Sequence, residues 1–163
     1  AQRGLITAFS VADWDTVVDI NLKRTFLCSR GAIPLLRKSG GGAIVTIGSE
    51  LAYVAEKNIS VYSATKAAVV HFTRCLANDH GADGIRVNCV CPGPVQTPML
   101  ERGIKDSPDS ALTRRRTEQT TILGRLGQPV EIANVVYFLA SDEASFITGS
   151  AILADGGVTS KAT

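Results

Sequence analysis

The chain has 163 residues and a mass of 17.2 kDa, a length that suits one domain better than two. Hydrophobic residues make up 45% and charged residues 20%, an ordinary globular composition that excludes disorder as the main state. The formal net charge of +2 gives no reason to expect a nucleic-acid partner, and no apolar run reaches the roughly 20 residues of a membrane span, so no membrane partner is expected.

The first predicted element is a helix from Asp13 to about Lys38. Ser10 is its expected N-cap, with an acidic residue three positions on, and apolar residues recur at helical spacing through the segment. Pro34 is expected to kink or end this helix near its last turn. Ser39 and the three glycines after it then break the chain.

Three β-rich runs alternate with further helical segments along the rest of the chain. The predicted strands are 43–47, 85–91 and 150–154, and the predicted helices are 61–80 and 129 to about 140. This alternation indicates an α/β fold with a parallel sheet. Ligands bind beyond the carboxyl ends of the strands in such sheets, so we expect one site at that edge.

The segment from Gln96 to about Gln128 is long, polar and weakly periodic. We predict a loop there, with Arg114, Arg115 and Arg116 on a solvated face. A loop of this length in a compact domain is usually functional and often acts as a lid.

The sharpest candidates for chemistry are Tyr62 and Lys66, which share a helix face at positions i and i+4. A free tyrosine has a pKa near 10, and a nearby ammonium is expected to lower it enough for acid–base work. The alternative is a surface tyrosine packed on a lysine stem. Ser49 strengthens the functional interpretation, because it ends a strand whose loop leads to the Tyr62 helix.

The strand at 85–91 ends in Pro92-Gly93-Pro94, followed by Val95 and, two positions on, Thr97. Proline and glycine at a strand end turn the backbone sharply and leave N–H and C=O groups free to meet a flat polar ligand. The Thr97 hydroxyl supplies one more donor and acceptor.

The four cysteines are Cys28, Cys75, Cys89 and Cys91. They show no CxxC spacing and no neighbouring histidine cluster, so no metal site is expected. Cys89 and Cys91 face the same side of a strand, and we expect both to be buried free thiols. Free thiols suit a reducing compartment, which makes the cytoplasm the expected location.

These residues together resemble the short-chain dehydrogenase/reductases, in their shorter, non-extended branch. The resemblance covers nearly the whole chain. The matching segments are Asp19-Ile20-Asn21-Leu22, Ile47-Gly48-Ser49, Tyr62-Ser63-Ala64-Thr65-Lys66, Pro92-Gly93-Pro94-Val95-Gln96-Thr97 and the closing stretches 124–127, 138–142, 148–150 and 154–157. Ser49 lies thirteen residues before Tyr62, as the family requires.

The resemblance implies an oxidoreductase that transfers a hydride between NAD or NADP, with NAD slightly favoured, and a secondary alcohol or ketone. It makes Tyr62 the general acid and base, and Ser49 the residue that orients the substrate oxygen. Lys66 would lower the Tyr62 pKa and hold the nicotinamide ribose, and Asn21 would help seat a proton-relaying water.

The resemblance also implies the residues that bind the two small molecules. Cofactor binding is expected from Tyr62, Lys66, Pro92, Gly93, Val95 and Thr97, and substrate binding from Ser49, Tyr62, Pro94 and Met99. Residues 98–128 would form the substrate-binding loop, with Leu100 a further pocket candidate.

The family's glycine-rich phosphate fingerprint is not found among these 163 residues. The chain therefore resembles the carboxyl-terminal two thirds of a family member, a partial dinucleotide-binding and catalytic domain over 1–163. The implied fold is a Rossmann-like doubly wound parallel sheet truncated to its last three strands with flanking helices. The strand at 43–47 would be an unpaired apolar edge. We expect the chain alone to be inactive or poorly folded, and its full-length parent to be an active dehydrogenase.

Two alternatives remain. The chain could be an inactive fragment or non-catalytic subunit that no longer binds cofactor, or it could belong to the extended epimerase branch, for which the early finish leaves no substrate domain. The resemblance also implies a homotetramer, with a dimer second. The helices at 13–38 and 62–80 would form one interface, and the closing strand with segment 145–149 another.

Overall fold

A three-stranded parallel sheet forms the middle layer of the chain, of which the computed structural model describes residues 3–161. The strands are β1 (Gly42–Ile47), β2 (Ile85–Pro92) and β3 (Ala151–Ala154), in the order β1-β2-β3. Gly42 pairs with Ile85 and Cys89 with Ala151, both in parallel register. The predicted parallel sheet is confirmed, and within the described residues β1 is an edge strand, as expected.

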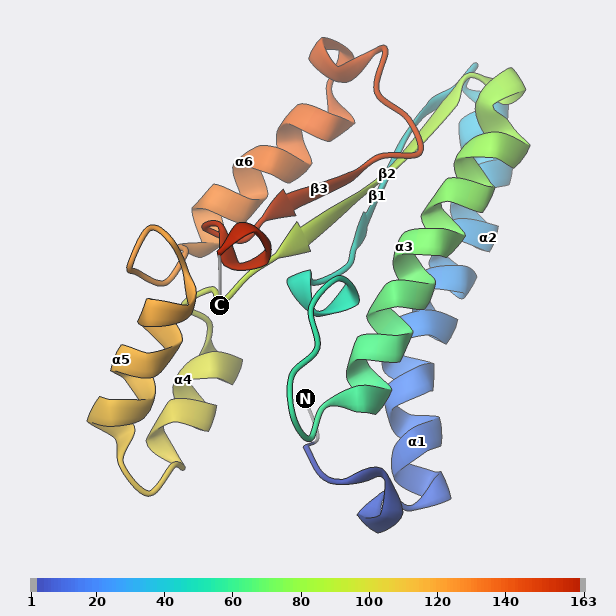
Figure 1. The fold of residues 1–163 in the computed structure, drawn as a ribbon. Coiled ribbons are helices and arrows are strands. Elements are labelled where there is room, and N and C mark those ends of the chain that lie inside the picture. Colours follow the sequence, from blue (N-terminus) through green and yellow to red (C-terminus); the bar gives the residue numbers. More distant parts are fainter. Residues whose placement is uncertain (1–2, 162–163) are drawn as a thin grey trace.

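Helices cover both faces of this sheet (Figure 1). On one face lie α2 (Arg24–Lys38) and α3 (Ser60–His80), and on the other lies α6 (Pro129–Ala140). The alternation of side chains along β2 explains the two cores: Ile85 and Val87 pack with α2 and α3, whereas Val90 packs with α6. The result is the helix–sheet–helix layering of a doubly wound fold.

The first predicted helix is one continuous helical rod with a change of pitch. It consists of α1 (Val11–Val18), a π-helical stretch (Asp19–Lys23) and α2. The predicted N-cap is confirmed, because the Ser10 Oγ accepts a hydrogen bond from the Asp13 N–H at 3.1 Å. Pro34 lies inside α2, and the helix continues past it to Lys38.

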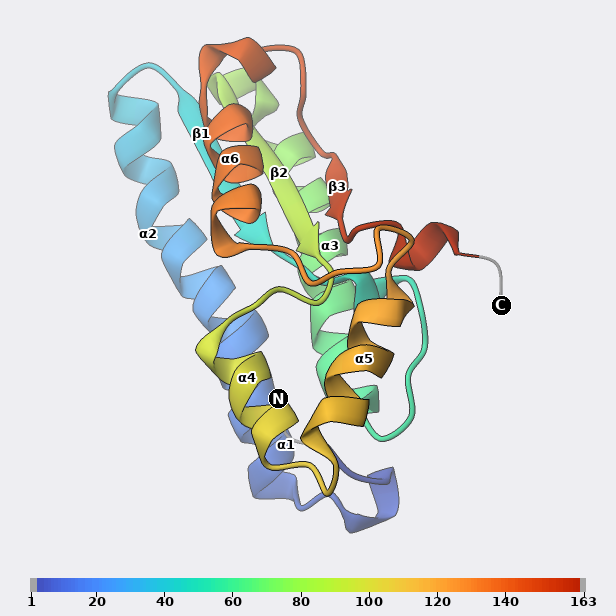
Figure 2. The ribbon, with the colours of Figure 1, turned by 90° about the vertical axis from the view of Figure 1, so that its left-hand side faces the viewer.

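The prediction of a loop over 96–128 is wrong in part, because two helices occupy it. They are α4 (Pro98–Lys105) and α5 (Ser110–Thr120), which lie side by side beyond the carboxyl ends of the strands (Figure 2). Capping starts both helices: Thr97 Oγ1 accepts from the Leu100 N–H at 3.3 Å, and Asp109 Oδ1 accepts from the Leu112 N–H at 2.9 Å. The segment is therefore a helical hairpin.

Polar side chains on β2 hold the segment that leads from α6 into β3. Arg86 donates to the carbonyls of Leu139 and Ser141, each at 2.9 Å, and so satisfies the carboxyl end of α6. The fully buried Asn88 donates to the Ile147 carbonyl at 2.7 Å. Across the described residues, none of the helices is both long enough and apolar enough to cross a membrane.

Candidate active site

Ser49 lies directly beyond the carboxyl end of β1. The Gly48 N–H still bonds the Val90 carbonyl at 2.7 Å, so the chain follows β2 up to this point. Ser49 is buried, with 5% of its surface exposed. Its Oγ accepts from the Leu51 N–H at 3.2 Å and donates to Glu50 Oε2 at 2.7 Å.

Tyr62 and Lys66 lie in the first two turns of α3, on the side that meets the end of β1. The Lys66 Nζ donates to the Ile47 carbonyl at 2.9 Å and lies 5.6 Å from the centroid of the Tyr62 ring. Both side chains are half-buried. The structure therefore brings the predicted Ser49, Tyr62 and Lys66 to one strand mouth.

The expectation that Lys66 lowers the Tyr62 pKa is not met. Burial raises the pKa of Tyr62, the interaction with Ser49 works to lower it, and the charge of Glu50 raises it further. Burial also lowers the pKa of Lys66. Because the ammonium donates to the Ile47 carbonyl and not to the phenol oxygen, desolvation dominates at the tyrosine.

Asn21 joins this group through α3. It lies in the π-helical stretch, a feature that often marks functional positions. Its Nδ2 donates to Thr65 Oγ1 at 3.1 Å, and that hydroxyl in turn donates to the Tyr62 carbonyl at 2.7 Å. Asn21 is thus held against the helix that carries Tyr62 and Lys66.

Residues 92–97, the segment predicted to meet the nicotinamide, start at the end of β2 and lie next to the end of β3. The Gly93 N–H donates to the Ala154 carbonyl at 3.1 Å, and a Cβ on Gly93 would lie 2.7 Å from the Asp155 backbone. Val95 forms a parallel bridge with Gly127. In that bridge Gln96 N–H donates to the Gly127 carbonyl and Gly127 N–H to the Pro94 carbonyl, at 2.8 and 3.0 Å.

The bridge leaves the backbone of Val95 itself available. None of the backbone hydrogen bonds outside regular elements in residues 3–161 uses its N–H or C=O. The Thr97 hydroxyl already accepts from the first turn of α4. Met99 lies on α4 and is 58% exposed, and Pro94 is half-buried.

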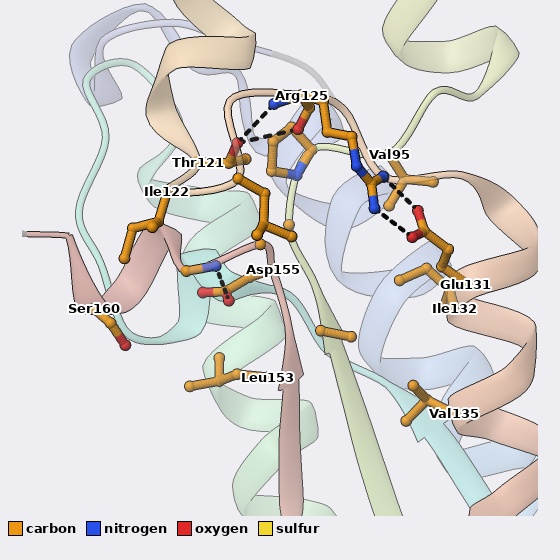
Figure 3. Close-up of a pocket in the computed structure, with 17 residues that line it drawn as sticks. Val95, Thr121, Ile122, Arg125, Glu131, Ile132, Val135, Leu153, Asp155 and Ser160 are labelled. Carbon is orange, nitrogen blue, oxygen red and sulfur yellow. Dashed lines mark hydrogen bonds and ion pairs between the residues drawn. The ribbon is translucent and has the colours of Figure 1, made fainter.

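A pocket of about 570 Å³ opens beside this segment, between the ends of β2 and β3 and the start of α6 (Figure 3). Gly93, Pro94 and Val95 line one side of it. Arg125 closes another side through two hydrogen bonds to Glu131, at 2.8 and 2.7 Å, which hold the Glu131 pKa at about 2. The lining does not include Ser49, Tyr62 or Lys66, so we place the chemistry at those side chains and treat this pocket as its neighbour.

Glu50 is a residue of this site that the sequence motifs did not reveal. Its carboxylate touches Ser49, and burial raises its pKa. The signal in the sequence was a carboxylate directly after a serine at a strand end.

The cysteines separate into two pairs. Cys89 and Cys91 are fully buried free thiols with their Sγ atoms 3.8 Å apart, as predicted, whereas Cys28 and Cys75 are exposed. Within residues 3–161 no group of three or more potential ligands could hold a metal ion.

Three comparisons relate this chain to known proteins. The family profile described as enoyl-(acyl carrier protein) reductase matches residues 1–159. The cyclopentanol dehydrogenase of Comamonas sp. (strain NCIMB 9872) is 41% identical over 163 residues, covering 97% of this chain and 64% of that protein.

Two solved structures share the fold. A Burkholderia xenovorans protein, described as a short-chain dehydrogenase/reductase, superposes with a TM-score of 0.93 at 33% identity, covering 99% of this chain and 62% of that one. The gluconate 5-dehydrogenase of Burkholderia cenocepacia, solved with NADP and tartrate, superposes with a TM-score of 0.91 at 31% identity. The match covers 98% of this chain and 61% of that one. The chain thus spans about three fifths of the length of these relatives.

Proposed function

Because the chain belongs to the short-chain dehydrogenase/reductase family, we propose that it carries the catalytic residues of an oxidoreductase acting on a secondary alcohol or ketone with NAD or NADP. The convergence of Ser49, Tyr62 and Lys66 at the mouth of β1 is the observation that carries the proposal. The relatives named for cyclopentanol and gluconate make cyclic alcohols and hydroxy acids the first substrates to try.

The backbone at 93–97 fits a nicotinamide. The carboxamide of that ring has one donor and one acceptor side, and the N–H and C=O of Val95 offer the complementary pair. Gly93 has no room for a side chain, which keeps this backbone close to β3. Tyr62, Lys66 and residues 92–97 would hold the cofactor, which would supply the hydride donor or acceptor at its C4 atom.

Each side chain has one task in this proposal. Ser49 orients the substrate oxygen next to Tyr62. In ketone reduction, Tyr62 gives its phenolic proton to that oxygen, and in alcohol oxidation it takes the proton back. Lys66, whose Nζ donates to the Ile47 carbonyl and lies 5.6 Å from the centroid of the Tyr62 ring, would hold the nicotinamide ribose. Asn21 fixes α3 through Thr65.

The test is Tyr62→Phe, which removes the proton donor and keeps the ring. Turnover of cyclopentanol or cyclopentanone by the full-length parent of this chain, followed by nicotinamide absorbance, is expected to fall by about 10² to 10⁴. Tyr137→Phe is the matched control, because Tyr137 is exposed on α6. Equal turnover by Tyr62→Phe and the unchanged protein would overturn the proposed role.

Cofactor binding is measured separately from turnover. The 163-residue chain is titrated with NADH and with NADPH, and nucleotide fluorescence reports binding. Saturable binding would support the nicotinamide site at 92–97. Absence of binding would favour the alternative, a chain that needs further residues to hold the cofactor.

A further inference from the structure

The hydroxyl proton of Ser49 has more than one candidate acceptor. A serine hydroxyl donates once and can accept twice. In the structure Ser49 gives its proton to Glu50 Oε2 at 2.7 Å and accepts from the Leu51 N–H at 3.2 Å. A carbonyl substrate would need that same proton, so Ser49 in this state can offer a substrate only its second acceptor site, next to the Tyr62 hydroxyl with which Ser49 interacts.

Ser49 is the larger of two hydrogen-bonding influences that stabilise the charge of Glu50. None of the ion pairs formed by residues 3–161 includes Glu50. Burial raises the Glu50 pKa, hydrogen bonds from Ser49 and from the backbone of Glu50 itself lower it, and the acids Asp155 and Glu56 raise it again. Glu50 also acts on Tyr62 of α3, because the charge of Glu50 raises the pKa of Tyr62.

Lys66, the basic side chain of the proposed site, forms no ion pair with Glu50. Lys66 donates to the Ile47 carbonyl and is not among the groups that act on the Glu50 carboxylate. The Ser49 proton is therefore the main side-chain interaction that favours the ionised form of Glu50.

We propose that Glu50 is a positioning residue for the proposed reaction: its ionised carboxylate holds the Ser49 proton, and its protonation releases that proton to a substrate carbonyl oxygen. The inference rests on the proposed function. Ionised Glu50 suits an alcohol, whose hydroxyl would donate to the second acceptor site of Ser49, in place of the interaction with Tyr62. Protonated Glu50 suits a ketone, which accepts the released proton.

The first test measures the ionisation of the Tyr62 hydroxyl and requires no turnover. The phenolate absorbance of the protein is titrated with pH, and the signal that disappears in Tyr62→Phe belongs to Tyr62. Glu50→Gln removes the charge and weakens the hold on the Ser49 proton, so the Tyr62 midpoint is expected to move to lower pH. An unmoved midpoint would overturn the proposal.

Two further variants separate positioning from simple charge. Glu56→Gln removes a neighbouring acid that is paired with Arg3 and does not bond Ser49, so a much smaller shift is expected. In a Ser49→Ala background, Glu50→Gln is expected to shift the midpoint of the Tyr62 titration less than it does when Ser49 is present. The reason is that part of the effect of Glu50 passes through the serine hydroxyl. An equal shift in both backgrounds would show that Glu50 acts by charge alone and would overturn the positioning role.

The second test measures how tightly the ketone and the alcohol bind, in a Tyr62→Phe background that suppresses turnover. At pH 8, Glu50→Gln is expected to lower the dissociation constant of the ketone from the NADH complex roughly tenfold, the scale of one charge-assisted hydrogen bond, without lowering that of the alcohol from the NAD complex. A purely structural role would weaken the binding of both, and that result would overturn the proposal. If the full-length parent turns over neither substrate, the proposed function fails, and the Tyr62 titration still decides whether Glu50 controls the Ser49–Tyr62 pair.

Discussion

Gly48 shows how closely the residues around the site are packed. It lies between the end of β1 and Ser49, and a Cβ there would come within 2.7 Å of the Cys91 Sγ and 3.0 Å of the Cys89 Sγ. Both thiols are fully buried, so neither can swing into solvent. This position therefore tolerates only a hydrogen as its side chain.

Gly48→Ala is expected to lower the free energy of unfolding by about 1–3 kcal/mol, the usual cost of overpacking a core, as measured by urea denaturation. Gly103→Ala is the control, since Gly103 lies in α4 and a Cβ added there would meet nothing within 4 Å, and it is expected to be neutral or stabilising by up to ~1 kcal/mol. Adding Cys91→Ala to Gly48→Ala should recover part of the loss. No recovery would mean that the strain lies elsewhere.

Asp155 is a buried carboxylate that shapes the turn after β3. It accepts from the Gly157 N–H at 2.9 Å and from the Thr159 N–H and Oγ1 at 2.9 and 2.7 Å. Burial works to raise its pKa, but these hydrogen bonds hold the pKa below its usual value. The ionised form therefore stabilises the fold above the unfolded-state pKa, and the contribution is lost as the pH falls through the folded-state pKa.

Asp155→Asn is accordingly expected to cost about 1–3 kcal/mol at pH 7, with the difference from the unchanged protein shrinking below about pH 4. Urea denaturation at several pH values measures this difference. Asp15→Asn, at an exposed position on α1, serves as the control. If the difference in the free energy of unfolding grew as the pH fell, the stabilising role of the ionised Asp155 would be contradicted.

At the scale of elements, the α4–α5 hairpin depends on one ion pair. Arg114 on α5 binds Glu101 Oε2 at 2.5 Å, and the other carboxylate oxygen of Glu101 is buried without a hydrogen-bond partner among the described residues. Both side chains are about one third exposed, so solvent weakens the pair. Its expected role is local: it holds the two helices together beyond the strands.

Arg114→Met keeps the apolar stem and removes the charge. Amide hydrogen exchange in residues 98–120 is expected to become faster, while the global free energy of unfolding changes by less than about 1 kcal/mol. Arg115→Met, on the same helix and exposed, should leave exchange unchanged. Equal exchange in both variants would show that the ion pair does not hold the hairpin.

The same hairpin shows where the sequence was insufficient. The strands and α6 followed from apolar runs and from Pro129, because buried elements carry periodic apolar residues. α5 has no buried residue in its sequence Ser110–Thr120, so periodicity could not reveal it. Its N-cap Asp109, and Thr97 with Pro98 before α4, were readable signals.

Only part of the candidate active site, likewise, could be predicted from the sequence. Motif spacing placed Ser49, Tyr62 and Lys66 on one strand mouth, because the ends of parallel strands and the helix between them must meet. It could not show where each proton points. That Lys66 donates to the Ile47 carbonyl and Ser49 to Glu50 depends on side-chain directions that only the packed structure determines.

For the whole molecule, exposed apolar side chains occur on many elements, and two groups of them bear on association. One group lies on the helical rod of α1 and α2, with Trp14, Ile20, Phe26, Leu27 and Leu35 exposed by 44–66%. The other lies around α6 and β3, where Tyr137, Leu153 and the fully exposed Phe146 contribute. We predict that each group belongs to an association site, and two distinct self-complementary interfaces would build a tetramer as a dimer of dimers.

We therefore expect four chains per particle in sedimentation velocity. Leu27→Asp and Phe146→Asp should each give dimers, because each removes one interface, and the double variant should give single chains. Leu112→Asp, at an exposed apolar position on α5, should leave the tetramer intact. An unchanged protein that sediments as a single chain at tens of micromolar would contradict the assembly, and single variants that both fall directly to monomers would mean that the two surfaces act as one interface.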